Sequence, residues 1–207
     1  MQEIKPPDKR DEILDVAEKL FAEQGFDAIT VREISKAADI NIAMVSYYFG
    51  SKEKLYEEVV NRKLISSDML RSNLGKFITY KEKLFALIDI YIDKFFESRQ
   101  FQNIIFREMT MNQRTEMAEK ITAQIHQNFM FSTGIINQGI KNKEFKKVDV
   151  EMTVMSIIGI VRMYTTSGNM ACKILEISEE EEAFNQKHKN RLRKHLKELI
   201  TNYLEIK

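Results

Sequence analysis

Residues that interrupt helices are scarce along the whole chain, and this scarcity constrains the fold more than any other feature. The 207 residues include 2 prolines and 7 glycines. Because hairpins and tight turns depend on these two residue types, so few of them leave little room for a β-sheet. Apolar residues instead recur at the three- and four-residue spacing of amphipathic helices. The sequence therefore predicts an all-α protein of about nine helices.

The first fifty residues carry clear signals for the ends of three helices. Gly25 stands where a left-handed C-terminal cap belongs. Thr30 can cap the second helix, and Glu33 three residues later completes a capping-box pattern. These three helices are predicted over 6–25, 30–39 and 42–49.

The remaining chain is predicted to form six further helices without a low-complexity linker. Ser51 can cap a long fourth helix, which would join the two parts of the chain rigidly. We expect a first domain over 1–52, extending to about residue 68, and a second over 53–207. The further helices are predicted over 51–70, 81–98, 102–112, 114–142, 149–175 and 178–207.

The short helix 42–49 has two different faces when successive residues are placed 100° apart. Val45 and Phe49 fall within about 40° of each other and form the buried face. Met44 and Tyr47 point the opposite way, on a helix too short to need a second buried face. Outward side chains on a short helix behind a tight turn are typical of a helix-turn-helix and favour DNA binding.

Two cations occupy unfavourable positions in the first turns of their helices. Lys52 opens the predicted fourth helix, and Arg32 lies in the first turn of the second. The helix dipole disfavours a cation there by a few tenths up to about 1 kcal/mol, so each position suggests an anionic partner such as a DNA phosphate. We expect the hydroxyl and amide of Thr30 to reach the same DNA backbone.

Two motifs stand at fixed spacing within residues 8–56: "ILDVAEKLFAEQGFDAITVREISKAADI" and "YYFGSKEKLY". They give a long helix that ends at Gly-Phe, a helix that starts at Thr, and Ser-Lys opening a further helix. This pattern resembles the DNA-binding domain of the TetR family of bacterial transcriptional repressors. More loosely, "INQGIKNKEFKKVDVEMTVMSIIGIV" resembles the family's ligand-binding domain.

The resemblance implies a ligand-responsive transcriptional regulator, expected to be a repressor that binds a palindromic DNA operator as a homodimer. A mostly apolar small-molecule effector would release it. In the family the third helix enters the major groove of DNA. Ile42 is counted among the base contacts, although the helical wheel places it near the core edge. The implied base contacts are Ile42, Ala43, Met44, Ser46, Tyr47 and Tyr48, and the implied phosphate contacts are Thr30, Arg32, Tyr48 and Lys52.

The charge of the N-terminal region leaves an alternative open. Seven bases against ten acids give residues 1–52 a net charge of −3, which is unusual for a DNA-binding region. The third helix is also apolar at Ile42, Ala43 and Met44, which suits thymine methyl groups but not bidentate base recognition. The alternative is a helical small-molecule sensor or interaction protein of the same fold without operator binding.

Aromatic and methionine side chains are frequent in the second predicted domain, and Trp is absent. These residues have two possible interpretations: they form an ordinary hydrophobic core, or they line a deformable pocket for an apolar effector. The residues assigned to this pocket are Phe85, Tyr91, Phe95, Phe106, Met109, His126, Phe129 and Met163.

The last two long helices carry apolar stripes in excess of what a single core requires. We expect them to pair across a two-fold axis as a four-helix bundle that forms the homodimer. The stripe residues are Val154, Ile157, Ile158 and Val161 on one helix and Leu192, Leu196, Leu199 and Tyr203 on the other. The basic stretch 187–197 is expected to be a solvated helix face, balanced by the acidic run 179–182.

Several function classes find no support in the sequence. No apolar run reaches about 18 residues, so no membrane span is predicted, and the single Cys172 suits a reducing cytoplasm. The three histidines have no metal-ligand spacing, and neither a Gly-rich phosphate loop nor a nucleophile motif occurs. We therefore expect no catalytic site, no metal and no cofactor.

Overall fold

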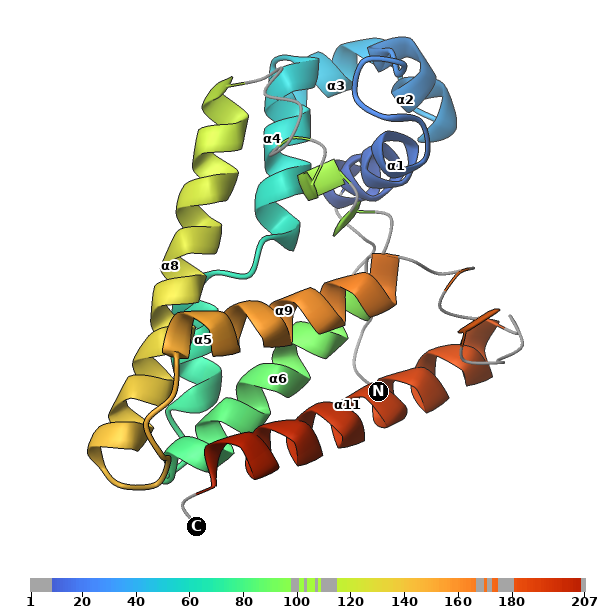
Figure 1. Ribbon diagram of the computed structural model, residues 1–207. Coiled ribbons are helices and arrows are strands. Elements are labelled where there is room, and N and C mark those ends of the chain that lie inside the picture. Colours follow the sequence, from blue (N-terminus) through green and yellow to red (C-terminus); the bar gives the residue numbers. More distant parts are fainter. Residues whose placement is uncertain are drawn as a thin grey trace, which may run out of the picture. The chain divides into compact units, whose positions relative to one another are not determined.

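The computed structural model describes residues 9–97, 101–102, 104–106, 108, 115–166, 170, 173–174 and 181–205. Within these residues nine α-helices have defined ends and no β-strand occurs, which confirms the all-α prediction (Figure 1). None of the described helices is long and apolar enough to cross a membrane. The helices are α1 (Lys9–Gln24), α2 (Val31–Ala37), α3 (Ile42–Phe49), α4 (Lys52–Lys63), α5 (Ser67–Leu74), α6 (Tyr80–Glu97), α8 (Thr115–Lys141), α9 (Val150–Thr166) and α11 (Glu181–Leu204).

The chain divides into two compact units. Unit 1 comprises Met1–Leu64 and Gln100–Glu119, and unit 2 comprises Ile65–Arg99 and Lys120–Lys207. Unit 1 therefore contains α1 to α4, which pack as α1 on α2 and α4, and α3 on α2 and α4. Unit 2 contains α5, α6, α9, α11 and most of α8.

The capping residues predicted for unit 1 are confirmed by the backbone, whereas the predicted start of the first helix lies outside the described residues. Gly25 adopts φ +88°, a left-handed conformation that costs glycine little, and its N–H donates to the Phe21 carbonyl over 2.9 Å. Thr30 caps α2 with Glu33 in a complete capping box, and the Ser51 hydroxyl caps α4. Local sequence signals are enough to fix these ends because each cap involves residues within a few positions of one another.

The helix α3 is held at both ends and anchored on one side. The Asn41 side chain accepts from the Ala43 N–H over 2.8 Å, and the Gly50 N–H donates to the Ser46 carbonyl over 2.9 Å. Val45 and Phe49 are buried, as the helical wheel predicts. The outer face of α3 is therefore presented from a fixed backbone.

The prediction of one long fourth helix over 51–70 is wrong. Helix α4 ends at Lys63, Leu64 is extended (φ −63°, ψ 132°), and the Ser66 hydroxyl caps α5 by accepting from the Met69 N–H over 3.1 Å. Ser66 and the acidic Asp68 offer a new helix start, and this start competes with continuation of α4. The two helices are separate, so a rigid single-helix join does not exist.

Unit 2 is built around α6, which lies between α9 and α11 (Figure 1). Its inward side chains Leu84, Ile88 and Ile92 are buried in one cluster with residues of α8, α9 and α11. Its outer carboxylates Asp89 and Asp93 pair with α11: Lys197 lies 2.6 Å from Asp89 and Arg193 lies 2.5 Å from Asp93. The basic stretch 187–197 is thus partly neutralised by α6, which the prediction of a solvated face missed.

The apolar stripes predicted to form the dimer interface are mostly buried within the chain. Val154, Ile157 and Val161 of α9 and Leu192 and Leu196 of α11 are buried in the core of unit 2. The reason is that α6 offers an apolar surface to both helices, so the stripes are covered without a partner. Ile158 is half-buried, whereas Leu199 and Tyr203 are exposed.

Candidate nucleic-acid interface

The outer face of α3 is apolar, phenolic and accessible. Tyr47 is 84% exposed, Ile42 is 49% exposed, and Ala43 and Ser46 are also exposed. Ile42 therefore lies on the outer face, although its wheel position is near the core edge. The faces of α3 follow from its sequence, since Val45 and Phe49 alone supply its buried side.

Two further side chains of α3 lie at the border between its faces. Met44 and Tyr48 are half-buried. The Tyr48 ring meets the Tyr47 ring edge-on, with centroids 5.2 Å apart, and lies 6.2 Å from the buried Phe49 ring. This row of aromatic contacts connects the outermost phenol to the core.

The donors of Thr30, which the sequence assigned to a phosphate, bond within unit 1 in this structure. Its hydroxyl and its backbone N–H donate to the same Glu33 carboxylate oxygen over 2.7 and 2.8 Å, and the Glu33 N–H donates back to the hydroxyl over 3.2 Å. Hydrogen bonds from the Thr30 hydroxyl and then from its backbone hold the pKa of the Glu33 carboxyl below its ordinary value. Thr30 thus serves the start of α2.

Lys52 has an internal role that the sequence did not reveal. Its ammonium donates to the carbonyls of Phe26 and Ile29 over 2.9 and 2.8 Å and lies 4.1 Å from the Phe26 ring centroid. These carbonyls belong to the connection between α1 and α2, whose backbone acceptors would otherwise need water. The position against the helix dipole is therefore explained by this connection and does not require an anionic ligand.

Arg32 remains as an accessible cation close to the start of α2. Its side chain is exposed, and no ion pair of Arg32 is found in the part of the chain that the structure describes. Its guanidinium can present several donors to a phosphate in fixed geometry. Of the three predicted phosphate contacts outside α3, Arg32 alone has kept its donors for an external partner.

Three of the ten acids of residues 1–52 form ion pairs along α1 and α4. Asp15 lies 2.5 Å from Arg62 and Glu18 lies 2.8 Å from Lys63. Glu58 pairs with Arg10, and Glu12 pairs with Lys9 over 2.5 Å. These ion pairs belong to helices other than α3, and α3 itself contains no acidic side chain.

An aromatic cluster supports this interface from inside unit 1. The Tyr56 ring lies 5.1 Å from the Phe21 ring and 4.8 Å from the Phe26 ring. The Tyr56 hydroxyl donates to the carboxylate of Glu108 over 2.9 Å, and both residues are buried. Sequence reasoning missed this bond, because its two partners are separated by 52 positions.

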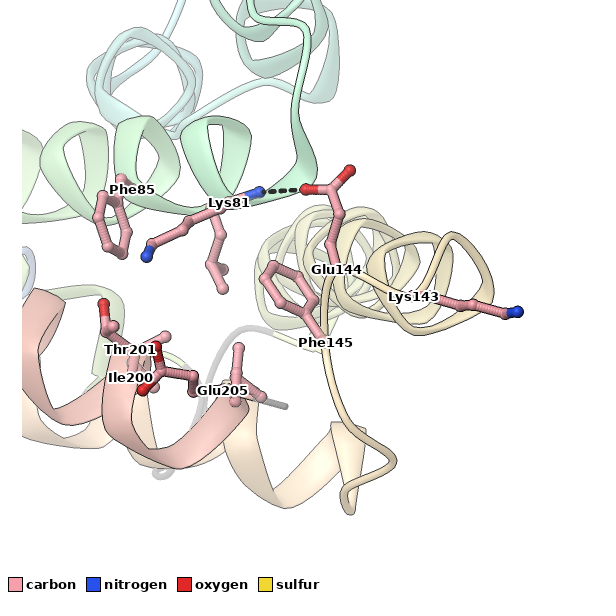
Figure 2. A pocket seen from close by; sticks show the side chains of 10 residues that line it. Lys81, Phe85, Lys143, Glu144, Phe145, Ile200, Thr201 and Glu205 are labelled. Atoms are coloured by element: carbon pink, nitrogen blue, oxygen red, sulfur yellow. Dashed lines mark hydrogen bonds between the residues drawn. The ribbon is translucent and has the colours of Figure 1, made fainter. Parts of the chain in front are cut away.

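The residues predicted to line an effector pocket differ in their surroundings. Tyr91 is buried with its hydroxyl 3.1 Å from the Ser132 hydroxyl, and burial raises the pKa of its phenol. Phe95 and Phe129 pack against the core of unit 2, while His126 and Met163 are exposed. Phe106 is exposed and belongs to unit 1, and Met109 lies outside the described residues. Phe85 lines a recess of unit 2 together with Lys81 and Phe145 (Figure 2).

A larger recess opens between α5, α8 and the start of α6 in unit 2. Its volume is about 440 Å³. The wall is mainly apolar and includes Leu74, Met130 and Ile135, while Arg71 and Lys83 add two cations. The sequence did not reveal this site because its lining comes from three helices distant along the chain.

Both parts of the chain match known protein families. Residues 13–59 match the family described as "Bacterial regulatory proteins, tetR family", and residues 78–166 match "Tetracyclin repressor-like, C-terminal domain". The "Probable HTH-type transcriptional regulator YttP" of Bacillus subtilis is 27% identical over 158 residues, which are 74% of this chain and 75% of that protein. The repressor KstR2 of Rhodococcus jostii is 26% identical over 160 residues, 70% and 72% of the two chains.

A solved structure extends the likeness to the whole fold. The TetR family regulator PfmR of Thermus thermophilus superposes with a TM-score of 0.74 at 20% identity, covering 98% of this chain and 100% of that one. At this identity the superposition demonstrates a shared architecture and leaves ligand and operator undefined.

Proposed function

We propose that this chain, which belongs to the TetR family of bacterial transcriptional regulators, represses transcription by placing the outer face of α3 in the major groove of an operator. The observation that carries the proposal is the outward display of Ile42 and Tyr47 on a helix anchored from the opposite side. That KstR2 is named a repressor supports repression over activation. Regulators of this family are not enzymes, so the proposed function consists of binding DNA and an effector.

The contacts proposed for α3 follow from its chemistry. Ile42, Ala43 and Met44 suit the methyl groups of thymine, and the hydroxyls of Ser46, Tyr47 and Tyr48 suit base edges or phosphates. Arg32 supplies the phosphate contact beside them. Thr30 and Lys52 contribute indirectly, because they fix the start of α2 and the connection before it.

A homodimer is proposed through faces that the core leaves uncovered. Met152, Met155 and Met163 of α9 are between 55% and 58% exposed, and Gly159 lies among them at helical spacing. Leu199 and Tyr203 of α11 are exposed as well, and exposed apolar side chains of this kind are expected of an association site. Two-fold symmetry would set two α3 helices about 34–36 Å apart, or a multiple of it, on a palindromic operator.

Release by a mostly apolar effector is proposed at the recess between α5 and α8. Its volume of about 440 Å³ falls within the range of about 300–1,000 Å³ typical of small-molecule sites. Helix α8, which lines the recess, also carries Asn128. The Asn128 side-chain amide donates over 2.7 Å to the carbonyl of Ile65, which lies in the connection after α4. An effector that shifts α8 would thereby bias the end of α4, and a coupling of about 1–3 kcal/mol would change operator affinity roughly 5- to 150-fold.

Fluorescence anisotropy with duplex DNA from upstream of the protein's own gene tests this proposal. Tyr47→Ala should weaken binding about tenfold or more, the cost of about 1–3 kcal/mol typical of a lost base contact. Ile78→Ala is the matched control, because Ile78 is 89% exposed in unit 2 and distant in sequence from α3. A wild-type protein that binds no such duplex, or a Tyr47→Ala protein that binds normally, would favour the sensor without operator binding.

A further inference from the structure

A second recess of unit 2 is not used by the proposed regulatory mechanism. It lies between the start of α6, the turn after α8 and the end of α11, and its volume is about 230 Å³ (Figure 2). This is below the range of about 300 Å³ and above that holds drug-sized ligands, so its ligand would be smaller. The lining residues are Lys81, Leu84, Phe85, Lys143, Glu144, Phe145, Ile200, Thr201, Leu204 and Glu205.

The apolar wall of this recess is held in place by a close contact. A Cβ on Gly139 would lie 2.2 Å from the Phe145 ring, so only glycine lets that ring lie flat against α8. The Phe145 N–H also donates to the Gly139 carbonyl over 3.2 Å. The Glu144 carboxylate accepts from the backbone N–H groups of Tyr80 and Lys81 over 2.7 and 3.2 Å, which ties the turn to the start of α6 (Figure 2). The recess is therefore largely preformed.

One cation and one anion at the opening keep their charges available. The Lys81 ammonium lies 5.8 Å from the Phe85 ring centroid, and Glu205 follows α11 on the other side. Neither forms an ion pair within the described part of the chain. Lys143 points away from the recess, and the Glu144 carboxylate is committed to α6 (Figure 2).

We propose that this recess binds a small zwitterion with one apolar arm, such as a free apolar amino acid. The carboxylate of the ligand would face Lys81, its ammonium would face Glu205, and its side chain would pack on Phe85 and Phe145. A simple carboxylate would be repelled by Glu205, and a simple amine by Lys81. A zwitterion satisfies both charges, as a site with few polar groups over an apolar floor requires. The site does not depend on operator binding.

Isothermal titration calorimetry with three matched probes tests the proposal on the full chain. Leucine carries both charges, 4-methylpentanoate lacks the ammonium, and 3-methylbutylamine lacks the carboxylate. The wild-type protein should bind leucine at least about tenfold more tightly than either analogue, the effect of one lost charge-assisted contact of about 1.4 kcal/mol or more.

Two charge-removing variants identify which end of the ligand each residue holds. Lys81→Gln should weaken leucine at least about fivefold and leave 3-methylbutylamine binding no weaker, whereas Glu205→Gln should weaken leucine and spare 4-methylpentanoate. Lys143→Gln removes the same charge as Lys81→Gln from the same rim but from a side chain that points outward, so it should change nothing (Figure 2).

Three outcomes would overturn the proposal. They are the absence of leucine binding to the wild-type protein, equal weakening of all three probes by either variant, and an effect of Lys143→Gln as large as that of Lys81→Gln. Thermal unfolding of each variant without ligand distinguishes these outcomes from loss of the fold, since a variant that unfolds at the wild-type temperature has kept the recess.

Discussion

Helices α3 and α9 both bury one face and expose apolar side chains on the other, but the exposed side chains differ in kind. Tyr47 of α3 is an aromatic side chain joined through Tyr48 to a buried ring, on a helix of 8 residues capped at both ends. Met152, Met155 and Met163 of α9 are flexible and spread along 17 residues. Rigid aromatic side chains suit a surface of fixed shape such as a DNA groove, whereas methionines adapt to a protein surface that can repack.

This contrast predicts that α9 determines assembly, and disrupting it should give the largest effect. Gly159→Arg would place like charges opposite each other across a two-fold axis, a cost of several kcal/mol. A Cβ at Gly159 meets nothing within 4 Å, so the folded chain tolerates the substitution. Sedimentation should show monomers, with operator affinity lowered roughly 100-fold, about 3 kcal/mol.

Ile78→Arg is the control for this prediction. Ile78 is 89% exposed and lies before α6, distant in sequence from α9. The control should sediment as the wild-type protein does. If Gly159→Arg does so as well, the methionine face of α9 is not the dimer surface.

The two faces of α3 should respond oppositely to truncation. Val45→Ala removes a fully packed side chain and should lower the free energy of unfolding by about 2 kcal/mol. The folded fraction should still bind the operator, because the outer face is unchanged. Tyr47→Ala should do the reverse, with normal stability and weak binding. Chemical denaturation combined with anisotropy separates these effects, and a Val45→Ala protein of normal stability would contradict the assigned faces.

The two cations near α3 should likewise differ. Lys52→Gln leaves the carbonyls of Phe26 and Ile29 without a charged donor and should cost about 1.5 kcal/mol of stability. Arg32→Gln should leave stability unchanged and reduce the slope of log affinity against log salt by about 1, as the loss of one phosphate contact does. The structural role assigned to Lys52 is wrong if its variant unfolds like the wild-type protein.

The smallest effect is expected at the cap of α2. Thr30→Ala should lower stability at neutral pH by about 1 kcal/mol, the typical cost of a lost N-cap. The hydrogen bonds that Thr30 donates also hold the pKa of Glu33 low, so a separate contribution of this pair is present above the unfolded Glu pKa of about 4.3 and is lost as the pH falls through the folded value. NMR titration should therefore show a higher Glu33 pKa in the variant. An unchanged pKa would mean that the capping box does not persist in solution.

The parts of the fold that sequence reasoning predicted correctly are those determined by neighbouring residues. The left-handed Gly25, the Thr30–Glu33 box and the inward positions of Val45 and Phe49 each depend on a segment of a few residues. Such local signals retain their meaning in any tertiary context, because backbone geometry alone determines which groups meet.

Sequence reasoning missed contacts where a residue has two possible partners and only the fold decides between them. Lys52 satisfies carbonyls 23 and 26 positions away, which no local pattern indicates. The stripe with Val154 and Val161 suits a partner chain as well as it suits α6, and α6 covers it. Ser66 could have continued α4, but it caps α5 instead. In each case long-range packing outweighed a reasonable local interpretation.

The central claim is that the outer face of α3 enters a groove of DNA, and photo-cross-linking tests it most directly. A benzophenone amino acid in place of Tyr47 should give an adduct with a base of the operator half-site. The same amino acid in place of Ile78, which is equally open to solvent, should give none. If the protein with the probe at position 47 binds the operator but forms no adduct with DNA, α3 is not the reading helix.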